Sequence, residues 1–190
     1  MTSLDRFIQN WRLRVGLRCL EGEPLRVIDV GAHQGECFVA LGDRLQAGFG
    51  IEPLAKTSTK ATHFEIQPGF FPAVRPAEGE WDAITLFAVL EHIPRSEHLA
   101  LADACFDLLR VGGRIIITVP SAMVDSILWV LKSLRLIDGM SLEEHFGFEA
   151  AETVNVFPPP RFRLVQHQRF QMGLNHLFVF EKKPSSADVK

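Results

Sequence analysis

Two acidic residues and two glycines in the N-terminal half have the types and spacing of a site for a nucleotide-like ligand. Asp29 lies near the end of an apolar run, and Gly31 and Gly35 bracket the turn that follows it. Glu52 ends the next apolar run, about 20 residues beyond the first glycine, where an acid can bind ribose hydroxyls. A glycine turn that leads into a helix presents backbone N–H groups and a positive dipole end to a ligand. We therefore expect a ligand at this turn.

Aromatic and imidazole side chains follow two later apolar runs. Phe70 and Phe71 come after the third run and offer ring faces to a purine, and we expect one of the two rings to belong to the core. The fourth run ends near Phe87, and Glu91 and His92 turn away from it. A metal site would need a third or fourth ligand that no compact cluster supplies, so we predict no metal. His92 is expected to position the ligand instead.

Strands and helices alternate along the chain and place these residues at one edge of a sheet. Strands are predicted at 25–30, 47–52, 63–66, 83–89, 114–119, 162–170 and 177–181. Helices are predicted at 3–20, 36–41, 96–109 with Ser96 as its cap, 124–137 and 148–157. The segment 54–62 is long enough only for a brief turn or for one or two helical turns. The last two strands are joined too closely for a crossover, so they should be antiparallel. The pattern predicts a three-layer α/β/α sandwich, whose mostly parallel seven-stranded sheet has an antiparallel C-terminal strand.

Composition limits the class of protein. The 190 residues suit one domain, expected over 1–183 with a flexible tail at 184–190, and the 47% hydrophobic and 23% charged fractions are typical of globular proteins. A net charge of −3 argues against a nucleic-acid binder. The three scattered cysteines indicate reduced thiols in a cytoplasmic protein. We see no signal peptide and no run of about 18 apolar residues, so no membrane span is expected.

The residues at specific positions exclude two other enzyme classes. A nicotinamide dinucleotide fingerprint would need glycine at 33 and glycine or alanine at 36, but the chain has His33 and Glu36. A serine hydrolase of the α/β type would need a G-x-S-x-G turn, and the sequence has none.

The chain resembles the class I, seven-stranded S-adenosylmethionine (SAM) dependent methyltransferases, in their small-molecule branch. The resemblance covers roughly residues 4–183, including the closing hairpin. The matching motifs are Val27-Ile28-Asp29-Val30-Gly31-Ala32-His33-Gln34-Gly35, Gly50-Ile51-Glu52, Phe87-Ala88-Val89-Leu90-Glu91-His92-Ile93 and Leu109-Arg110-Val111-Gly112-Gly113-Arg114. It implies SAM as cofactor and S-adenosylhomocysteine (SAH) as product. In this family the glycine turn holds the methionine part, the acid after the second strand holds the ribose, and the end of the fourth strand lies beside the sulfonium.

The residues expected at the cofactor follow from these motifs. They are Asp29, Gly31, Ala32, His33, Gly35, Glu52, Pro53, Phe70, Phe71, Phe87, Ala88 and His92. Two positions depart from the family pattern. His33 replaces the middle glycine, and its ring can either bind the SAM carboxylate or face solvent. The acid often found after the third strand is replaced by Gln67-Pro68-Gly69, so adenine recognition falls to the backbone and to Phe70 or Phe71.

The methyl acceptor is expected to be a small molecule, which can be hydrophobic. We expect its site to be covered by the N-terminal helix at 1–20 and a lid within 121–160. The apolar stretch Val124 to Ile137 is read as a partly buried lid helix; a dimer contact, and so a homodimer, or a membrane-facing surface would suit it as well. No catalytic residue is identified, and His92 and His145 are the candidates for a general base. The alternative is a non-catalytic SAM-binding or partner-binding protein that retains the fold.

Overall fold

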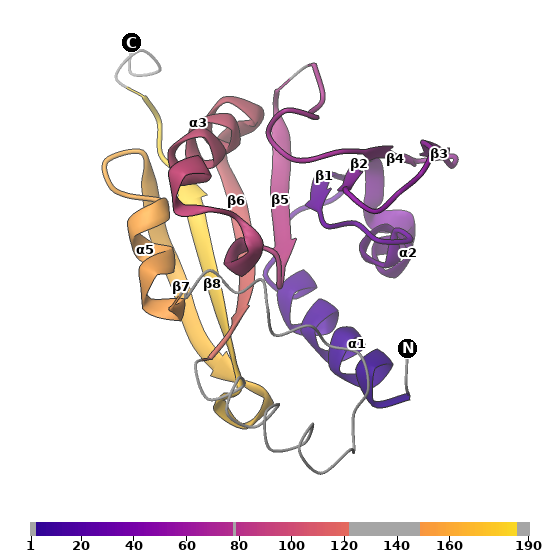
Figure 1. Cartoon of the computed structure of the whole chain (residues 1–190). Coiled ribbons are helices and arrows are strands. Elements are labelled where there is room, and N and C mark those ends of the chain that lie inside the picture. Colours follow the sequence, from indigo (N-terminus) through magenta and orange to yellow (C-terminus); the bar gives the residue numbers. More distant parts are fainter. Residues whose placement is uncertain (1–2, 78, 122–148, 186–190) are drawn as a thin grey trace.

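The apolar, β-branched runs of the sequence form the strands of one eight-stranded sheet (Figure 1). The computed structural model describes residues 3–77, 79–121 and 149–185. The strands are β1 (Leu25–Val30), β2 (Leu45–Glu52), β3 (Thr59–Lys60), β4 (Phe64–Pro68), β5 (Trp81–Phe87), β6 (Leu109–Pro120), β7 (Phe162–Phe170) and β8 (Asn175–Lys182). Their order across the sheet is β3-β4-β2-β1-β5-β6-β8-β7.

The strand directions confirm the predicted architecture. β4, β2, β1, β5 and β6 run parallel to one another, whereas β8 runs antiparallel to both β6 and β7. The chain turns from β7 to β8 through the single turn Gln171–Gly173, too short for a crossover, which is why the reversal was foreseeable.

Of the two alternatives predicted for 54–62, the helical turns are wrong, and a brief turn opens the segment at 53–54. This segment instead contains β3, which pairs antiparallel with β4 through Thr59 opposite Ile66 and Lys60 opposite Glu65. Both residues of β3 are exposed, as are most of their neighbours, so the segment has no apolar face with which a helix could pack. It adds an eighth, edge strand to the predicted seven.

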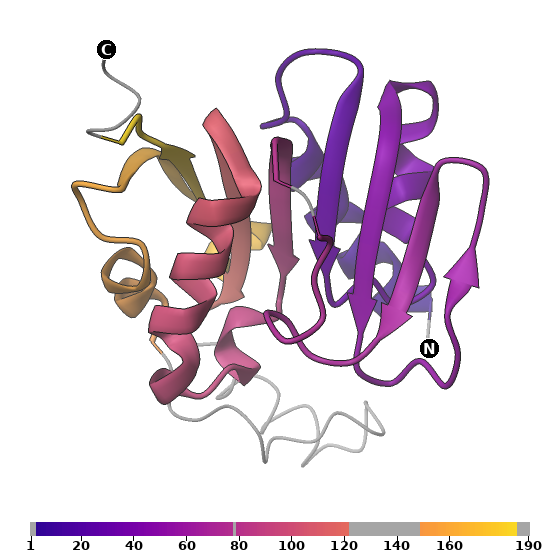
Figure 2. The same ribbon diagram turned by 90° about the horizontal axis from the view of Figure 1, so that it is seen from above.

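Helices cover both faces of the sheet (Figures 1 and 2). α1 (Ser3–Leu17) and α2 (Glu36–Leu41) lie on one face, and α3 (His98–Leu108) and α5 (Thr153–Val156) on the other. α3 begins at His98 without a side-chain cap, so the predicted cap at Ser96 is wrong, since that residue belongs to a preceding 3-10 turn, Arg95–Glu97. The predicted helix at 148–157 is α5 with the 3-10 turn Ala150–Glu152 before it. The predicted helix at 124–137 lies outside the described residues.

Each face of the sheet has its own apolar core. Ile84, Ile117 and Phe180 pack on the side of α3 and α5. Val27 and Ile116, together with residues of α1 and α2, fill the other side. This two-sided burial explains why β1, β5 and β6 have nearly continuous apolar sequences.

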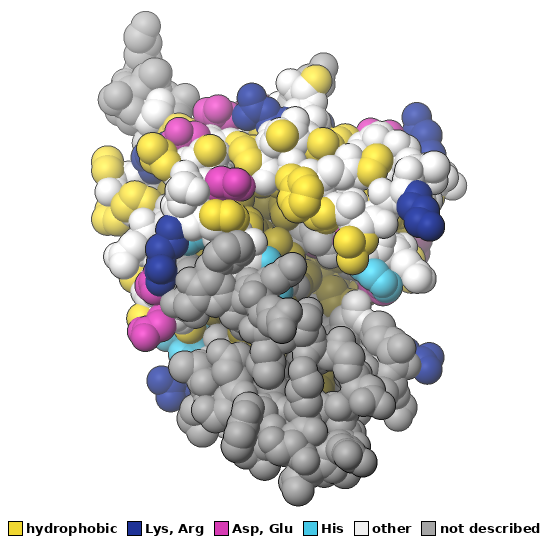
Figure 3. Space-filling view, in the orientation of Figure 1, with side chains coloured by type: hydrophobic (Ala, Val, Ile, Leu, Met, Phe, Trp, Pro, Cys, Tyr) yellow, Lys and Arg dark blue, Asp and Glu magenta, His cyan; other side chains and the backbone are white. Residues whose placement is uncertain are grey.

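The parallel strands all end at one edge of the sheet, and α1 lies across part of it. The contact is close, because a Cβ on Gly16 of α1 would stand 2.2 Å from the ring of Phe87 at the end of β5. No helix among the described residues is long and apolar enough to cross a membrane. On the face shown in Figure 3, acidic and basic side chains of the described residues are interspersed.

Candidate functional site

The turn after β1 is shaped by three residues with positive φ. Gly31 has φ 77°, His33 has φ 46° and Gly35 has φ 87°. A Cβ on Gly31 would lie 2.6 Å from Cγ2 of Val89, which comes from the turn after β5. The glycine at 31 is therefore required both by its conformation and by the close approach of a second loop. His33 adopts a left-handed conformation that is uncommon for residues other than glycine, although histidine takes it more often than most.

The backbone N–H groups of this turn are not free, contrary to the expectation that they would receive the ligand. Each N–H from Gly31 to Gly35 already has an acceptor within the protein. The acceptors are Ile51 O for Gly31 (2.8 Å) and Ala32 (3.1 Å), Glu52 Oε2 for His33 (2.8 Å), Glu36 Oε2 for Gln34 (3.1 Å) and Ala32 O for Gly35 (2.7 Å). Two of the five N–H groups donate to carboxylates, so the protein itself supplies the anions that a phosphate would otherwise provide at such a turn.

Glu36, at the first position of α2, is one of these carboxylates. Its Oε1 lies 2.7 Å from Nδ1 of His33, and its Oε2 accepts the N–H of Gln34. Burial acts to raise the pKa of Glu36, but the hydrogen bonds from His33 and from the backbone outweigh it and the pKa is lowered. The imidazole of His33 is thus engaged by its own loop while the side chain remains exposed.

Glu52, at the end of β2, is the other carboxylate and links two loops. Its Oε2 accepts the N–H of His33, and its Oε1 accepts the N–H of Leu54 at 2.9 Å. A carboxylate has about four lone-pair sites, so both oxygens keep capacity for a further donor. The residue is half-buried, whereas Pro53 after it is exposed. Glu52 is therefore held in position by the backbone and can still accept hydrogen bonds from a ligand.

Asp29 is buried directly beneath the turn. Its Oδ1 accepts a hydrogen bond of 2.5 Å from Oγ1 of Thr85 on the neighbouring strand β5. Burial raises the pKa of Asp29 to about 7, although the bond from Thr85 opposes this, and the charges of Glu36 and Glu52 raise the pKa further. The mutual influence of the three carboxyl groups shows that they share one small region. This concentration of acid makes the turn a favourable place for a cation and an unfavourable one for a phosphate.

The aromatic residues expected beside the cofactor have different environments. Phe71 is 5% exposed and belongs to the core, whereas Phe70 is 71% exposed. This confirms that one of the two rings is core, and it leaves Phe70 as the ring with a free face. Phe87 is half-buried against Gly16 of α1, and Ala88 after it has φ 57° with its N–H bonded to Thr118 O at 2.9 Å.

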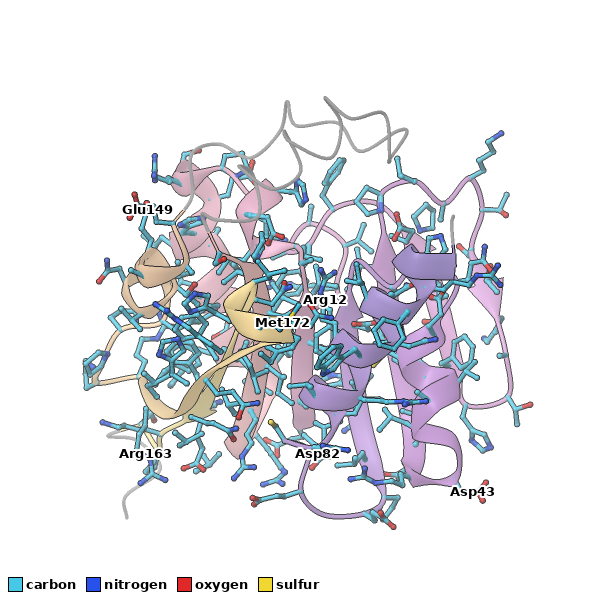
Figure 4. All side chains as sticks on the ribbon, turned by 90° about the horizontal axis from the view of Figure 1, so that it is seen from below. Arg12, Asp43, Asp82, Glu149, Arg163 and Met172 are labelled. Atoms are coloured by element: carbon cyan, nitrogen blue, oxygen red, sulfur yellow. The ribbon has the colours of Figure 1, made fainter. Side chains whose placement is uncertain are left out.

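The ends of β5, β6 and β8 continue the same edge and carry buried polar groups. Gln171 donates to Ile8 O of α1 at 3.0 Å and accepts from Asn175 at 2.5 Å, which ties α1 to the β7–β8 turn. Arg12 of α1 points into the molecule, near the middle of the view from below in Figure 4. Burial lowers the pKa of Arg12, and the charge of the buried Glu91 opposes this change.

The two histidines considered as general bases are placed differently. His92 is exposed and ends the 3-10 turn Leu90–His92 after β5. His145 lies outside the described residues. Within the described parts of the chain, no group of three or more histidine, cysteine, aspartate or glutamate side chains could hold a metal ion.

Several residues of the edge were not predicted to take part. Thr85 and Val89 come from β5 and its turn, more than fifty residues from Asp29 and Gly31, so no local pattern could have assigned them. Glu36 was used only to exclude a dinucleotide, although a carboxylate three residues after His33 and one after Gly35 is well placed to bond the turn. The roles of Gly16 and Arg12 depend on where α1 packs.

These residues fit SAM. The ribose has hydroxyl donors for Glu52, which is held in place with acceptor capacity left, and the sulfonium and ammonium groups suit the acidic environment around Asp29. The exposed ring of Phe70 has a face available for the adenine. The bonded amides of the turn count against a pyrophosphate-containing dinucleotide, in agreement with the failed fingerprint.

Comparison with known proteins also points to the methyltransferases. A family model described as a methyltransferase domain matches residues 3–169. A ubiquinone biosynthesis O-methyltransferase of Psychrobacter arcticus is 29% identical over 128 residues, 60% of this chain and 49% of the relative. The chain thus spans about half the length of that relative.

Solved structures show the same fold at low sequence identity. A chain of the Haloferax volcanii complex between the Trm112 methyltransferase activator and a methyltransferase has a TM-score of 0.71 and 14% identity, covering 93% of this chain and 91% of its own. The 1,6-didemethyltoxoflavin-N1-methyltransferase of Burkholderia thailandensis, with SAH bound, has a TM-score of 0.66 and 16% identity. The match covers 95% of this chain and 82% of that structure's chain. N-methyltransferase NodS of Bradyrhizobium japonicum has a TM-score of 0.65 and 13% identity, covering 95% and 97%. The chain therefore belongs to the methyltransferase domain family, as a class I SAM-dependent methyltransferase with SAM as its cofactor.

Proposed function

We propose that this protein transfers a methyl group to a small-molecule acceptor held beside the ends of β5 and β6. The observation that carries the proposal is the acidic turn: Asp29, Glu36 and Glu52 surround a loop whose N–H groups are already bonded. Such a loop favours a cationic ligand. When bound, SAM supplies an electrophilic methyl group on a positively charged sulfur. The name of the P. arcticus relative, an O-methyltransferase of ubiquinone biosynthesis, supports a small organic acceptor.

The residues of this chain would contribute mainly by binding and orientation. Glu52 accepts the ribose hydroxyls, Phe70 covers one face of the adenine, and Asp29 with its charge stabilises the cationic end of the ligand. Gly31 and Ala88 give the backbone of both loops the shape that lets a ligand approach closely. Holding nucleophile and methyl group collinear can account for about 7–11 kcal/mol of the barrier.

A general base is needed only if the acceptor must lose a proton, and it typically contributes about 10²–10⁴-fold. We assign this role to His92 or His145. If His92→Ala and His145→Ala each keep near-normal turnover on the true acceptor, neither residue is the base.

Calorimetry with SAM and SAH tests the proposal. The wild-type protein should bind both, and Glu52→Gln should weaken binding about tenfold to hundredfold, because a charged acceptor of hydrogen bonds is lost. Glu65→Gln, a half-buried glutamate on the neighbouring strand β4, serves as the matched control and should bind normally. If the wild-type protein binds neither compound, or if Glu52→Gln binds as well as wild type, the proposed site is wrong.

Turnover is then measured as SAH release with a panel of phenols, catechols and aromatic amines. SAH release that depends on one acceptor class supports an enzyme. Tight binding without turnover across the panel favours the alternative, a SAM-binding protein that retains the fold without catalysis.

A further inference from the structure

The outward side of α1 carries two aromatic residues followed by two arginines. Phe7, Trp11, Arg14 and Arg18 are spaced by four, three and four positions, which places them in one line along a helix. Phe7 is 59% and Trp11 39% exposed, and their rings make an edge contact with centroids 5.7 Å apart. All four side chains are exposed, so this line, which we call the α1 stripe, lies on the surface of α1, a helix at the outside of the molecule in Figure 1.

The two arginines of the α1 stripe have no acidic partner within the described parts of the chain. Among the residues described by the structure, neither Arg14 nor Arg18 forms an ion pair, although both are exposed. Nearby arginines behave differently, since Arg44 bonds Glu23 at 2.7 Å and Arg114 bonds Glu21 at 2.9 Å. The chain as a whole has a net charge of −3, so the cationic character of the stripe is local.

A groove between α1 and α2 adjoins the α1 stripe. Its volume is about 720 Å³, and Arg14 and Arg18 belong to its lining together with Arg44. The buried side chains of Leu13 and Leu17 also line it. The groove therefore combines apolar surface with a cationic rim. Its acidic lining residue, Glu36, is engaged by His33 and by the backbone N–H of Gln34.

We propose that the α1 stripe and its groove dock on the surface of a membrane rich in anionic phospholipid. Phenylalanine and tryptophan together with arginine are the residue types of helices that lie in the membrane interface, where an amphipathic ring such as tryptophan suits the boundary between lipid and water. The α1 stripe has four side chains, whereas a stable protein interface uses about 20–30 residues a side, which argues against a second copy or an acidic protein. Arginines without intramolecular partners complement phosphate groups.

Docking in this way would bring lipid close to the reaction edge of the sheet. α1 touches both sides of that edge, because Gly16 packs on Phe87 and Ile8 accepts a hydrogen bond from Gln171. Next to Gln171, Met172 is 94% exposed at the tip of the β7–β8 turn and adds an apolar contact beside α1 (Figure 4). The proposal concerns where the protein works and does not require the proposed acceptor chemistry.

Flotation of the full chain with vesicles tests the proposal. Vesicles of phosphatidylcholine alone are compared with vesicles that also contain phosphatidylglycerol, at fixed ionic strength. The wild-type protein should partition at least about tenfold more strongly into the anionic vesicles, and this preference should weaken as salt is raised. Arg14→Gln with Arg18→Gln should reduce anionic binding about thirtyfold, and Phe7→Ala with Trp11→Ala at least about tenfold.

Matched variants keep the test specific. Lys60→Gln with Arg75→Gln removes two exposed charges away from α1, and Leu99→Ala removes an exposed apolar side chain of α3, so both should bind as wild type. Urea unfolding midpoints show whether each variant is folded, independently of SAM binding. Any of three results would overturn the membrane-docking surface. The protein could partition equally into neutral and anionic vesicles, the arginine variant could bind anionic vesicles as well as wild type, or inorganic phosphate at equal ionic strength could fully displace the protein from the vesicles.

Discussion

Around the glycine turn, each backbone N–H from Gly31 to Gly35 has an acceptor, and Asp29 and Glu52 are both hydrogen-bonded. At the ends of β6 and β8 the situation is different. Oγ1 of Thr118, Oγ of Ser121 and Oδ1 of Asn175 are buried and have no hydrogen-bond partner among the residues that the structure describes. We call the first region the cofactor half of the edge and the second the acceptor half.

The cofactor half is preformed, because its polar groups are hydrogen-bonded within the protein. The acceptor half contains buried polar atoms whose hydrogen bonds are not satisfied by the described protein atoms. Buried polar atoms without partners are rare in folded proteins, because each costs free energy. The cofactor half uses its own carboxylates to hold its loop, and its shape does not depend on a ligand. The acceptor half keeps unused hydrogen-bonding capacity next to Phe87 and Ala88. Five substitutions test this comparison.

Asp29→Asn should have the largest effect. The pKa of Asp29 is about 7 in the folded protein and about 3.9 when unfolded, so the folded state holds the proton more strongly. Asp29 makes its full favourable contribution to the free energy of unfolding below about pH 4. That free energy then falls by up to about 4 kcal/mol as the pH rises towards 7. Above pH 7 the asparagine variant should therefore be more stable than wild type by up to that amount, and its stability should vary less between pH 4 and 7.

Urea unfolding at several pH values checks this prediction, with Asp43→Asn on an exposed turn as the control. SAM should bind more weakly to Asp29→Asn, because a buried negative charge near the ligand has been removed. If Asp29→Asn were less stable than wild type at pH 8, the charge of Asp29 would be holding the turn together, and the prediction would be contradicted.

Gly31→Ala should destabilise the fold by about 2–4 kcal/mol, because a side chain at positive φ is strained and its Cβ would overlap Val89. Gly22→Ala is a close control. Gly22 also has positive φ, 81°, but a Cβ there would have no atom within 4 Å. Gly22→Ala should therefore lose only the cost of placing a side chain at positive φ, about 1 kcal/mol of the free energy of unfolding. Equal losses in the two variants would mean that the contact between the two loops contributes nothing.

Two buried threonines on neighbouring strands compare the halves directly. Thr85 donates to Asp29, whereas Oγ1 of Thr118 has no partner. Thr85→Val should cost about 2 kcal/mol, since it leaves a buried carboxyl group without its donor. Thr118→Val should be neutral or stabilising by up to about 1 kcal/mol, since it removes an unsatisfied hydroxyl. Chemical unfolding of both variants measures the difference, and a loss at Thr118 as large as that at Thr85 would contradict it.

His33→Gly should have the smallest effect. Glycine relieves the positive φ of position 33 but removes the bond to Glu36, so stability should change by less than about 1 kcal/mol. SAM affinity should change less than about threefold if His33 serves its own loop. A tenfold loss in calorimetry, with unchanged stability, would instead show that the imidazole binds the SAM carboxylate.

Much of this protein was predictable because its signals are local. Short β-branched runs such as Leu25–Val30 and Arg114 to Val119 predict buried strands, and the short join after Phe170 requires an antiparallel hairpin. Gly31 with Glu52 predicts a nucleotide-like ligand, which the resemblance to the methyltransferases narrows to SAM. In each of these cases a few adjacent residues determine backbone conformation and burial. The eighth strand was missed because β3 is an exposed edge strand with no apolar pattern.

Only the tertiary structure decided which polar atoms bond to one another and which rings are free. Asp29 meets Thr85, Gly31 meets Val89 and Gln171 meets Ile8 across strands and loops far apart in the sequence. Phe70 and Phe71 are adjacent and chemically identical, yet one is exposed and the other is core. The physical reason is that burial and hydrogen bonding depend on neighbours in space. The glycine turn was therefore correctly located from the sequence, but its acidic, internally bonded character could be recognised only once the loops that surround it were in place.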